Sequence, residues 1–227
     1  MVVQDGVVMA VDSRGTGGNY SQQTTINDDT QKVFAFGSRC GIALAGTLDL
    51  GTAIIREARA ALAPLDMRAP DVDEAARVIS DVARQFWERN RLGQLPPDSR
   101  QAVLFLVGGL TADGSPRVYV IISQLNFTPQ CPAEGYGVIG LPLFGMYWLN
   151  RVYSPGMDPE KGTSLASFIV AEAASQDGRI GGTIRTLAIS RTSGTLMGPH
   201  QSIPQAVDDN VGVLSGIRDA LVGGVLP

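Results

Sequence analysis

Cysteine, histidine and lysine are all scarce in this chain of 227 residues. The two cysteines, Cys40 and Cys131, are too few for a disulfide framework and lack the spacing of a metal site. No stretch reaches the roughly 18 apolar residues that span a bilayer, and no basic region precedes the first apolar run. The sequence therefore predicts no membrane partner, no signal peptide and a reducing, cytoplasmic location.

Basic charge is also limited, because the formal net charge is −4 at pH 7. Basic runs and aromatic stripes are missing too, so we expect no nucleic-acid partner. The single histidine, His200, and the lack of a Gly-x-Ser-x-Gly stretch give no support to a serine–histidine triad. Only two of the 18 basic residues are lysines, Lys32 and Lys161, so each retained lysine is a candidate for chemistry that arginine cannot perform.

Apolar residues make up 44% of the chain, and no stretch of the sequence has the composition of a linker between domains. This composition predicts one globular domain over residues 1–227. Short apolar runs predict strands. They fall at Val7–Val11, Gln31–Phe36, Gly41–Ala45, Ala102–Gly108, Arg117–Ile122, Tyr136–Ile139 and Ile184–Ser190.

Between groups of these strands, apolar residues recur at helical spacing. It predicts helices over Asp49–Ala63, from a cap at Asp71 to a stop at Gly93, over Leu141–Val152, from Asp158 to about Ser175, and over Ala206–Leu221. Strands pair locally through hairpins while helices come in pairs. This order favours α+β, as a four-layer αββα sandwich with two stacked antiparallel sheets between helix layers.

Three stretches of the chain resemble motifs of the proteasome β-type subunits. The first strand runs into Asp12-Ser13-Arg14-Gly15-Thr16, "QKVFAFGSRCGIALAGTLD" resembles the lysine-bearing strand and the strand ending in Ala-Gly, and "MDPEKGTSLASFIVAEAASQDGRIGG" resembles the late helix with its Asp and Gly-Gly. The similarity covers residue 1 to about 200. It implies the αββα fold of the N-terminal nucleophile hydrolases.

Members of that family attack a peptide carbonyl with the hydroxyl of an N-terminal threonine, whose own α-amine serves as base. Such an amine has an ordinary pKa of about 7.7–8.0, so it can accept a proton near neutral pH. The resemblance implies catalytic positions at Asp12, Lys32, Gly46 and Asp177, and substrate contacts at Thr16 and Leu44. Lys32 is expected beside the nucleophile, and Asp12 is expected to orient it.

The other implied roles are more general. Gly46 is expected to turn its N–H to the developing oxyanion, and Leu44 to line an apolar pocket. Each residue also has an ordinary structural interpretation: a surface lysine, a turn aspartate, a turn glycine, or, for Asp177, a loop residue at the end of a helix.

Two departures from the family pattern bear on activity. Counting back about sixteen residues from Asp12 puts the expected threonine about five residues ahead of Met1, so the 227-residue chain is expected to lack peptidase activity. Gly140, or Leu141, and Ile180 stand where the family has supporting serines. Three hypotheses stay open: a threonine-type peptidase, an inactive structural ring subunit, and an N-terminal nucleophile amidase acting on a small amide.

The resemblance also implies partners. We expect self-association into hexameric or heptameric rings, which in this family often stack as double rings through helices. A peptide or unfolded protein is the expected substrate, an ATP-dependent unfoldase is a candidate partner, and no cofactor or metal is expected.

Overall fold

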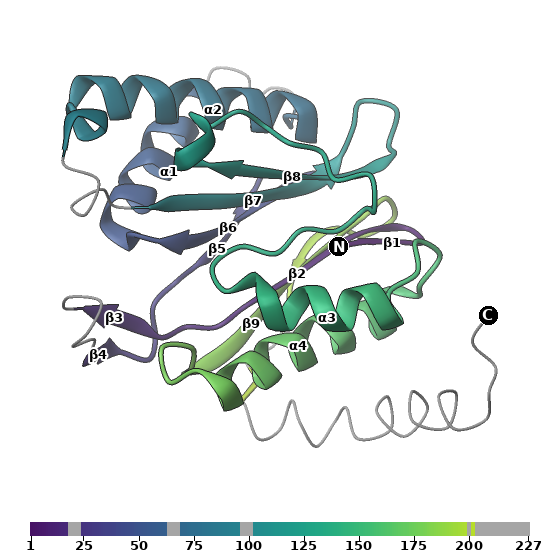
Figure 1. Ribbon diagram of the computed structural model, residues 1–227. Helices are drawn as coiled ribbons and strands as arrows, with labels where there is room; N and C mark the ends of the chain where they lie inside the picture. Colours follow the sequence, from purple (N-terminus) through teal and green to yellow (C-terminus); the bar gives the residue numbers. More distant parts are fainter. Residues whose placement is uncertain (18–23, 63–68, 96–101, 199–200, 203–227) are drawn as a thin grey trace.

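The computed structural model describes residues 1–17, 24–62, 69–95, 102–198 and 201–202. Figure 1 shows four layers. Helices α1 and α2 lie over the sheet that contains β5 to β8, and the sheet that contains β1, β2 and β9 lies beneath it. Helices α3 and α4 cover the outer face of that lower sheet. The αββα arrangement expected from the order of elements is therefore confirmed.

Both sheets of the sandwich are antiparallel. The first has the order β1-β2-β9-β10, with β11 also pairing with β9, and the second has the order β5-β6-β7-β8. The strands of the first are β1 (Val2–Val3), β2 (Gly6–Val11), β9 (Thr183–Ser190), β10 (Gly194–Met197) and β11 (Gln201–Ser202). Those of the second are β5 (Val33–Phe36), β6 (Cys40–Gly46), β7 (Val103–Leu110) and β8 (Pro116–Ile122). A separate hairpin, β3 (Gly15–Gly17) with β4 (Thr24–Asn27), projects from one end of the sandwich (Figure 1).

Capping aspartates begin two of the helices, α2 and α4. The helices are α1 (Leu48–Leu62), α2 (Val72–Arg89), α3 (Pro142–Val152) and α4 (Pro159–Gln176), with short 3-10 turns at Leu92–Gln94 and Ser123–Leu125. Asp71 accepts the backbone N–H of Glu74 at 2.9 Å, and Asp158 accepts that of Glu160 at 2.8 Å. Proline at the first position of α3 and of α4 costs no hydrogen bond, because the first N–H groups of a helix have no partner within it.

Apolar side chains fill all three interfaces between layers. Phe105, Ile121 and Ile79 belong to the cluster between α1, α2 and the second sheet. Val7 and Leu187 belong to the cluster between the two sheets. Burying side chains of this kind stabilises by about 1.5–3 kcal/mol each, so the two sheets are held face to face mainly by this apolar contact.

The predicted elements match the observed ones closely, with two corrections. Residues 136–139 form no strand, because this segment packs as irregular chain against Leu106 and Val120 without ladder hydrogen bonds. The sequence of the Gly-rich stretch after Arg14 indicates a turn, but its first residues, Gly15–Gly17, form strand β3. The helix predicted over Ala206–Leu221 lies outside the described residues.

One charged group is buried by the fold itself. The α-amine of Met1 donates to the carbonyl of Val8 at 2.7 Å, and Met1 is only 6% exposed. Burial lowers the pKa of this amine from its ordinary value of 8.0 to about 5. The folded chain therefore binds fewer protons than the unfolded chain between these two pH values, and it loses stability as the pH falls through that window.

This linkage predicts a measurable pH dependence. The free energy of unfolding of the 227-residue chain should fall by about 2 kcal/mol from pH 8 to pH 6, and by less if β1 detaches first. Urea titrations at the two pH values measure it, with His200→Gln used throughout so that no histidine titrates. A chain with three serines ahead of Met1 should show little change, because its amine lies outside the fold. Equal pH dependence in the two chains would contradict the assignment.

Candidate active site

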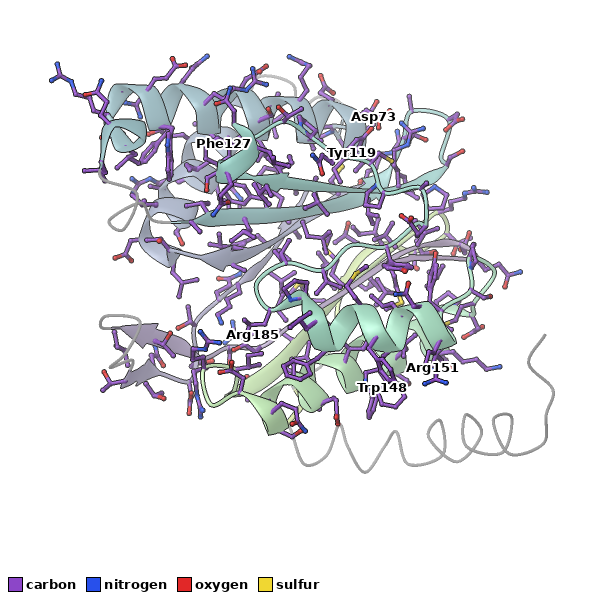
Figure 2. The ribbon with its side chains drawn as sticks, viewed as in Figure 1. Asp73, Tyr119, Phe127, Trp148, Arg151 and Arg185 are labelled. Carbon is purple, nitrogen blue, oxygen red and sulfur yellow. The ribbon has the colours of Figure 1, made fainter. Side chains whose placement is uncertain are left out.

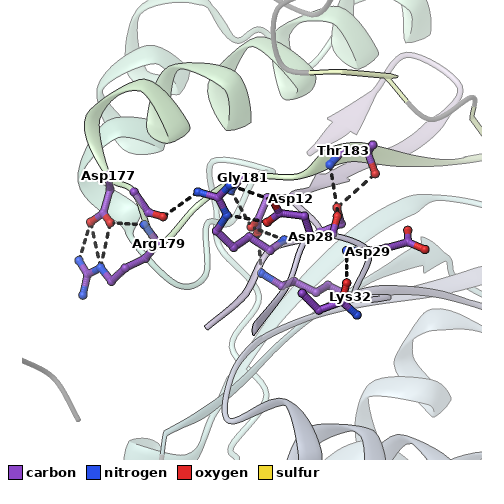
Figure 3. Close-up of polar contacts among 12 residues, drawn as sticks. Asp12, Asp28, Asp29, Lys32, Asp177, Arg179, Gly181 and Thr183 are labelled. Atoms are coloured by element: carbon purple, nitrogen blue, oxygen red, sulfur yellow. Dashed lines mark hydrogen bonds and ion pairs between the residues drawn. The ribbon is translucent and has the colours of Figure 1, made fainter. Parts of the chain in front are cut away.

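Lys32 and Asp12 meet across the two sheets. Asp12 directly follows β2 of the first sheet, and Lys32 directly precedes β5 of the second. The Lys32 Nζ lies 2.8 Å from Asp12 Oδ1, and the two side chains are only 13% and 15% exposed (Figure 3). The predicted contact between the ammonium and the carboxylate is therefore present. Its catalytic role stays a prediction.

The second oxygen of Asp12 is also occupied. Its Oδ2 accepts the backbone N–H groups of Gly181 and Arg14, each at 3.1 Å. A mostly buried ion pair is stable only when its remaining hydrogen-bonding capacity is met, and here backbone donors meet it. Asp12 is therefore fixed as an ionised acceptor that keeps the Lys32 ammonium at one place.

Ser13 joins three segments beneath this pair. It is fully buried, and its hydroxyl donates to the carbonyl of Asp28 at 2.5 Å while accepting the N–H of Thr183 at 2.7 Å. Its own carbonyl accepts the N–H of Thr30 at 2.8 Å. The end of β2, the start of β9 and the chain leading to Lys32 are thus joined by one buried residue.

The two glycines before β9 make room for these contacts. A side chain at Gly182, where φ is +74°, would place its Cβ 2.4 Å from both the Asp28 carbonyl oxygen and the Ser13 hydroxyl. A Cβ at Gly181 would lie 2.4 Å from the guanidinium carbon of Arg14. Only glycine allows the chain to approach this closely.

Arg14 closes the outer side of the site. Its guanidinium binds both carboxylate oxygens of Asp28, at 2.6 and 3.0 Å, and donates to the carbonyl of Gly178 at 2.9 Å. The pKa of the Asp28 carboxyl is lowered by the hydrogen bond from Arg14. Arg14 thus joins the segment after β2 to Asp28 and Gly178.

Asp177 is held away from the Lys32–Asp12 pair by its own neighbour. It caps the end of α4, and its carboxylate binds the guanidinium of Arg179, with Oδ2 at 2.5 Å from an Nη (Figure 3). The hydrogen bond from Arg179 lowers the pKa of the Asp177 carboxyl. The structure does not bring this predicted site residue into contact with Lys32, so its catalytic role stays a prediction.

Gly46 and Leu44 lie on the strand next to Lys32. The N–H of Leu44 binds the carbonyl of Lys32 at 2.8 Å, and Gly46 lies two residues further along, at the exposed end of β6 with φ of +88°. The Leu44 side chain is 1% exposed and packs in the core against Gly51, so it does not reach the surface. Thr16 is half-buried in the hairpin of β3 and β4, opposite Thr25.

The backbone differs at the two positions where the family has serines and this chain has Gly140 and Ile180. Gly140 has φ of +90°, a conformation that strains any residue with a side chain, so a serine would not fit this backbone without strain. Ile180 forms a turn, with its N–H bound to the carbonyl of Asp177 at 3.0 Å.

The site also contains residues that sequence reasoning left out. Hydrogen bonds join buried Ser13 to half-buried Thr183 and to exposed Asp28, and the sequence signal for this close approach is the Gly-Gly pair before β9. In the described part of the chain, no three His, Cys, Asp or Glu side chains gather as a metal centre would require. No helix among the described residues has the length and hydropathy to cross a membrane.

Two stacked antiparallel sheets between helix layers, with a Lys–Asp pair bridging the sheets at one end, define the α+β sandwich of the N-terminal nucleophile hydrolase class. The model of the proteasome subunit family matches residues 1–189. The chain therefore belongs to the proteasome subunit family. No curated protein matches the chain.

The two glycines allow a matched stability test. Gly182→Ala should lower the free energy of unfolding by roughly 1–3 kcal/mol, because its Cβ overlaps Asp28 and Ser13 at a positive φ. Gly178→Ala, in the same loop, meets no atom within 4 Å and should change stability little. Urea denaturation of both variants decides it, and equal losses would show that the close approach at Gly182 is not needed.

Proposed function

We propose that this chain is a threonine-type peptidase subunit of the proteasome family, in which Lys32 and Asp12 serve a nucleophile that the polypeptide carries ahead of Met1. The observation that supports this most is the mostly buried Lys32–Asp12 pair at 2.8 Å. A structural subunit has no evident need for an ammonium that is costly to bury, whereas a nearby hydroxyl nucleophile gains from its charge.

The register of β1 gives a second argument. Met1 lies opposite Val8 on β2. No described strand pairs with β2 on its β1 side beyond Val8. If β1 were extended in the same register, the fifth residue ahead of Met1 would lie opposite Ser13, beside Asp12.

The face of the sheet agrees with this placement. Val7, Met9 and Val11 belong to the cluster between the two sheets, so a residue opposite Ser13 would also face the sheet that carries Lys32. The buried Met1 amine fits the same picture. An amide in its place would keep the hydrogen bond to Val8 without the cost of a desolvated amine.

The chemistry then follows from the residues. A threonine hydroxyl at this position attacks the peptide carbonyl, and its free α-amine takes the proton. The Lys32 ammonium, fixed by Asp12, lowers the pKa of that hydroxyl by favouring the anion. The N–H of Gly46, at the same end of the second sheet, stabilises the oxyanion, a role whose loss typically costs about 10²–10³ in rate. No cofactor is needed.

An inactive structural subunit is the second candidate. It is favoured by the conformation of Gly140, which does not suit a serine, and by the pairing of Asp177 with Arg179. Both candidates keep the assembly expected of the family.

Membership of the family implies ring-like self-assembly. We propose hexameric or heptameric rings, stacked in pairs through α3, working in the cytoplasm on peptides or on chains delivered by an ATP-dependent unfoldase. The outer face of α3 supports the stacking, because Leu143 and Tyr147 are 82% and 52% exposed (Figure 2 shows the position of this helix through Trp148 and Arg151). Large apolar side chains exposed on one helix face suit a protein contact.

Activity should depend on residues ahead of Met1 and on Lys32. The 227-residue chain should not cleave fluorogenic peptides, whereas a chain extended by its in-frame upstream codons, and processed to a free threonine, should cleave them. In that extended chain, Lys32→Ala should reduce turnover by at least about a hundredfold, while Lys161→Ala on the exposed start of α4 should leave it unchanged. If the upstream codons encode no threonine about five residues ahead of Met1, or if Lys32→Ala is fully active, the peptidase proposal fails and the structural subunit remains.

The stacking proposal has its own test. Leu143→Glu should halve the size of the assembled particle in sedimentation velocity, because a buried carboxylate without a partner opposes the contact. Arg77→Glu, on the exposed outer side of α2, is the matched control and should leave the particle intact. An unchanged particle with Leu143→Glu would exclude α3 from the contact.

A further inference from the structure

Arg185 is a buried cation that the proposed chemistry does not use. It lies on β9 opposite Val11, on the face between the sheets, and the residue is 9% exposed. Its guanidinium binds the carboxylate of Asp29 and lies 3.4 Å from the Asp29 carbonyl oxygen. Among the described residues, its buried Nε has no hydrogen-bond partner. Burying a guanidinium costs free energy of desolvation, and the ion pair with Asp29 offsets part of this cost.

Asp29 follows Asp28, and both belong to the segment that leads into Lys32. Arg14, which follows β2, binds Asp28, and Arg185 of β9 binds Asp29, so two arginines hold two consecutive aspartates of the segment between β4 and β5. Figure 3 shows Asp28 and Asp29 beside Lys32 and Asp12, and Figure 2 shows Arg185 at the same end of the sandwich.

We infer that Arg185 and Asp29 are a positioning pair for Lys32. The Lys32 ammonium comes from the second sheet and must reach a carboxylate on the first, so the segment ahead of it has to be fixed to the first sheet. Arg185 does this from within the core, where its side chain is 11% exposed, by binding the carboxylate of the exposed Asp29. The catalytic meaning of this role rests on the proposed peptidase function, but the coupling itself does not.

The lysine content of the chain makes the coupling measurable. Only Lys32 and Lys161 carry side-chain amines, so methylation with ¹³C-formaldehyde and a reductant gives two lysine signals and one from the N-terminus. Lys32 should react slowly in the native chain, and exposed Lys161 should react quickly. Asp29→Asn and Arg185→Gln should each raise the rate at Lys32 by roughly three- to fivefold, while Lys161 keeps its rate.

Asp29→Asn is the decisive variant, because it keeps the size of a side chain that is 79% exposed and removes only the charge that pairs with Arg185. Arg89→Gln, which removes the Arg89–Glu57 pair between α1 and α2, is the matched control and should leave Lys32 slow. Arg185→Lys, which keeps a cation near Asp29, should restore part of the protection.

Each outcome decides the inference. Unchanged labelling of Lys32 in Asp29→Asn would overturn it, and so would a rate that rises equally at both lysines in Arg185→Gln with a lower melting temperature, since Arg185 would then only stabilise the fold. Faster labelling of Lys32 alone supports it. If that result is obtained while the upstream-extended chain cleaves no peptide, the positioning pair stands and the peptidase function fails.

Discussion

The arrangement depends on one ion pair between two stacked sheets, that of Lys32 with Asp12. Apolar contact between sheets is not directional, and it would tolerate small shifts of one sheet over the other. The Asp12 carboxylate accepts hydrogen bonds from Lys32, Gly181 and Arg14, and this set of contacts does not tolerate such shifts. The contacts of Ser13, Arg14 and Arg185 at this end of the sandwich are best understood as the groups that hold the register between the sheets.

This end of the sandwich combines openness with rigidity. Gly46 is exposed at the end of β6, and the side of β2 beyond Val8 has no described partner strand. Directly below them, Ser13 is fully buried and hydrogen-bonded to chain segments on either side. A catalytic site needs both properties, because substrate must reach it while the reacting groups stay fixed. The same geometry also suits a retained scaffold, and this is why the identity of the residues ahead of Met1 separates the two functions.

Much of the fold could be predicted from local pattern. Asp71 and Asp158 cap helices where expected, and Pro142 and Pro159 occupy first helical turns. The prediction of a strand at residues 136–139 was wrong, because an apolar run indicates burial and does not indicate which backbone groups form hydrogen bonds. Leu44 shows the limit of a resemblance: its position in the chain matched the family, but its side chain packs inside the core. Asp177 is similar, since only the structure shows that Arg179, two residues away, takes its carboxylate.

The sequence by itself predicted the layers, because strand length, helix spacing and caps are local properties, whereas the pairing of Lys32 with Asp12 was implied by the resemblance to the proteasome family. Tertiary structure decided everything that joins distant segments. The N–H of Gly181 reaches Asp12, the N–H of Thr183 reaches Ser13, and Arg185 reaches Asp29, across separations of 169, 170 and 156 residues. Such contacts depend on how two sheets stack and twist against each other, and no local pattern carries that information.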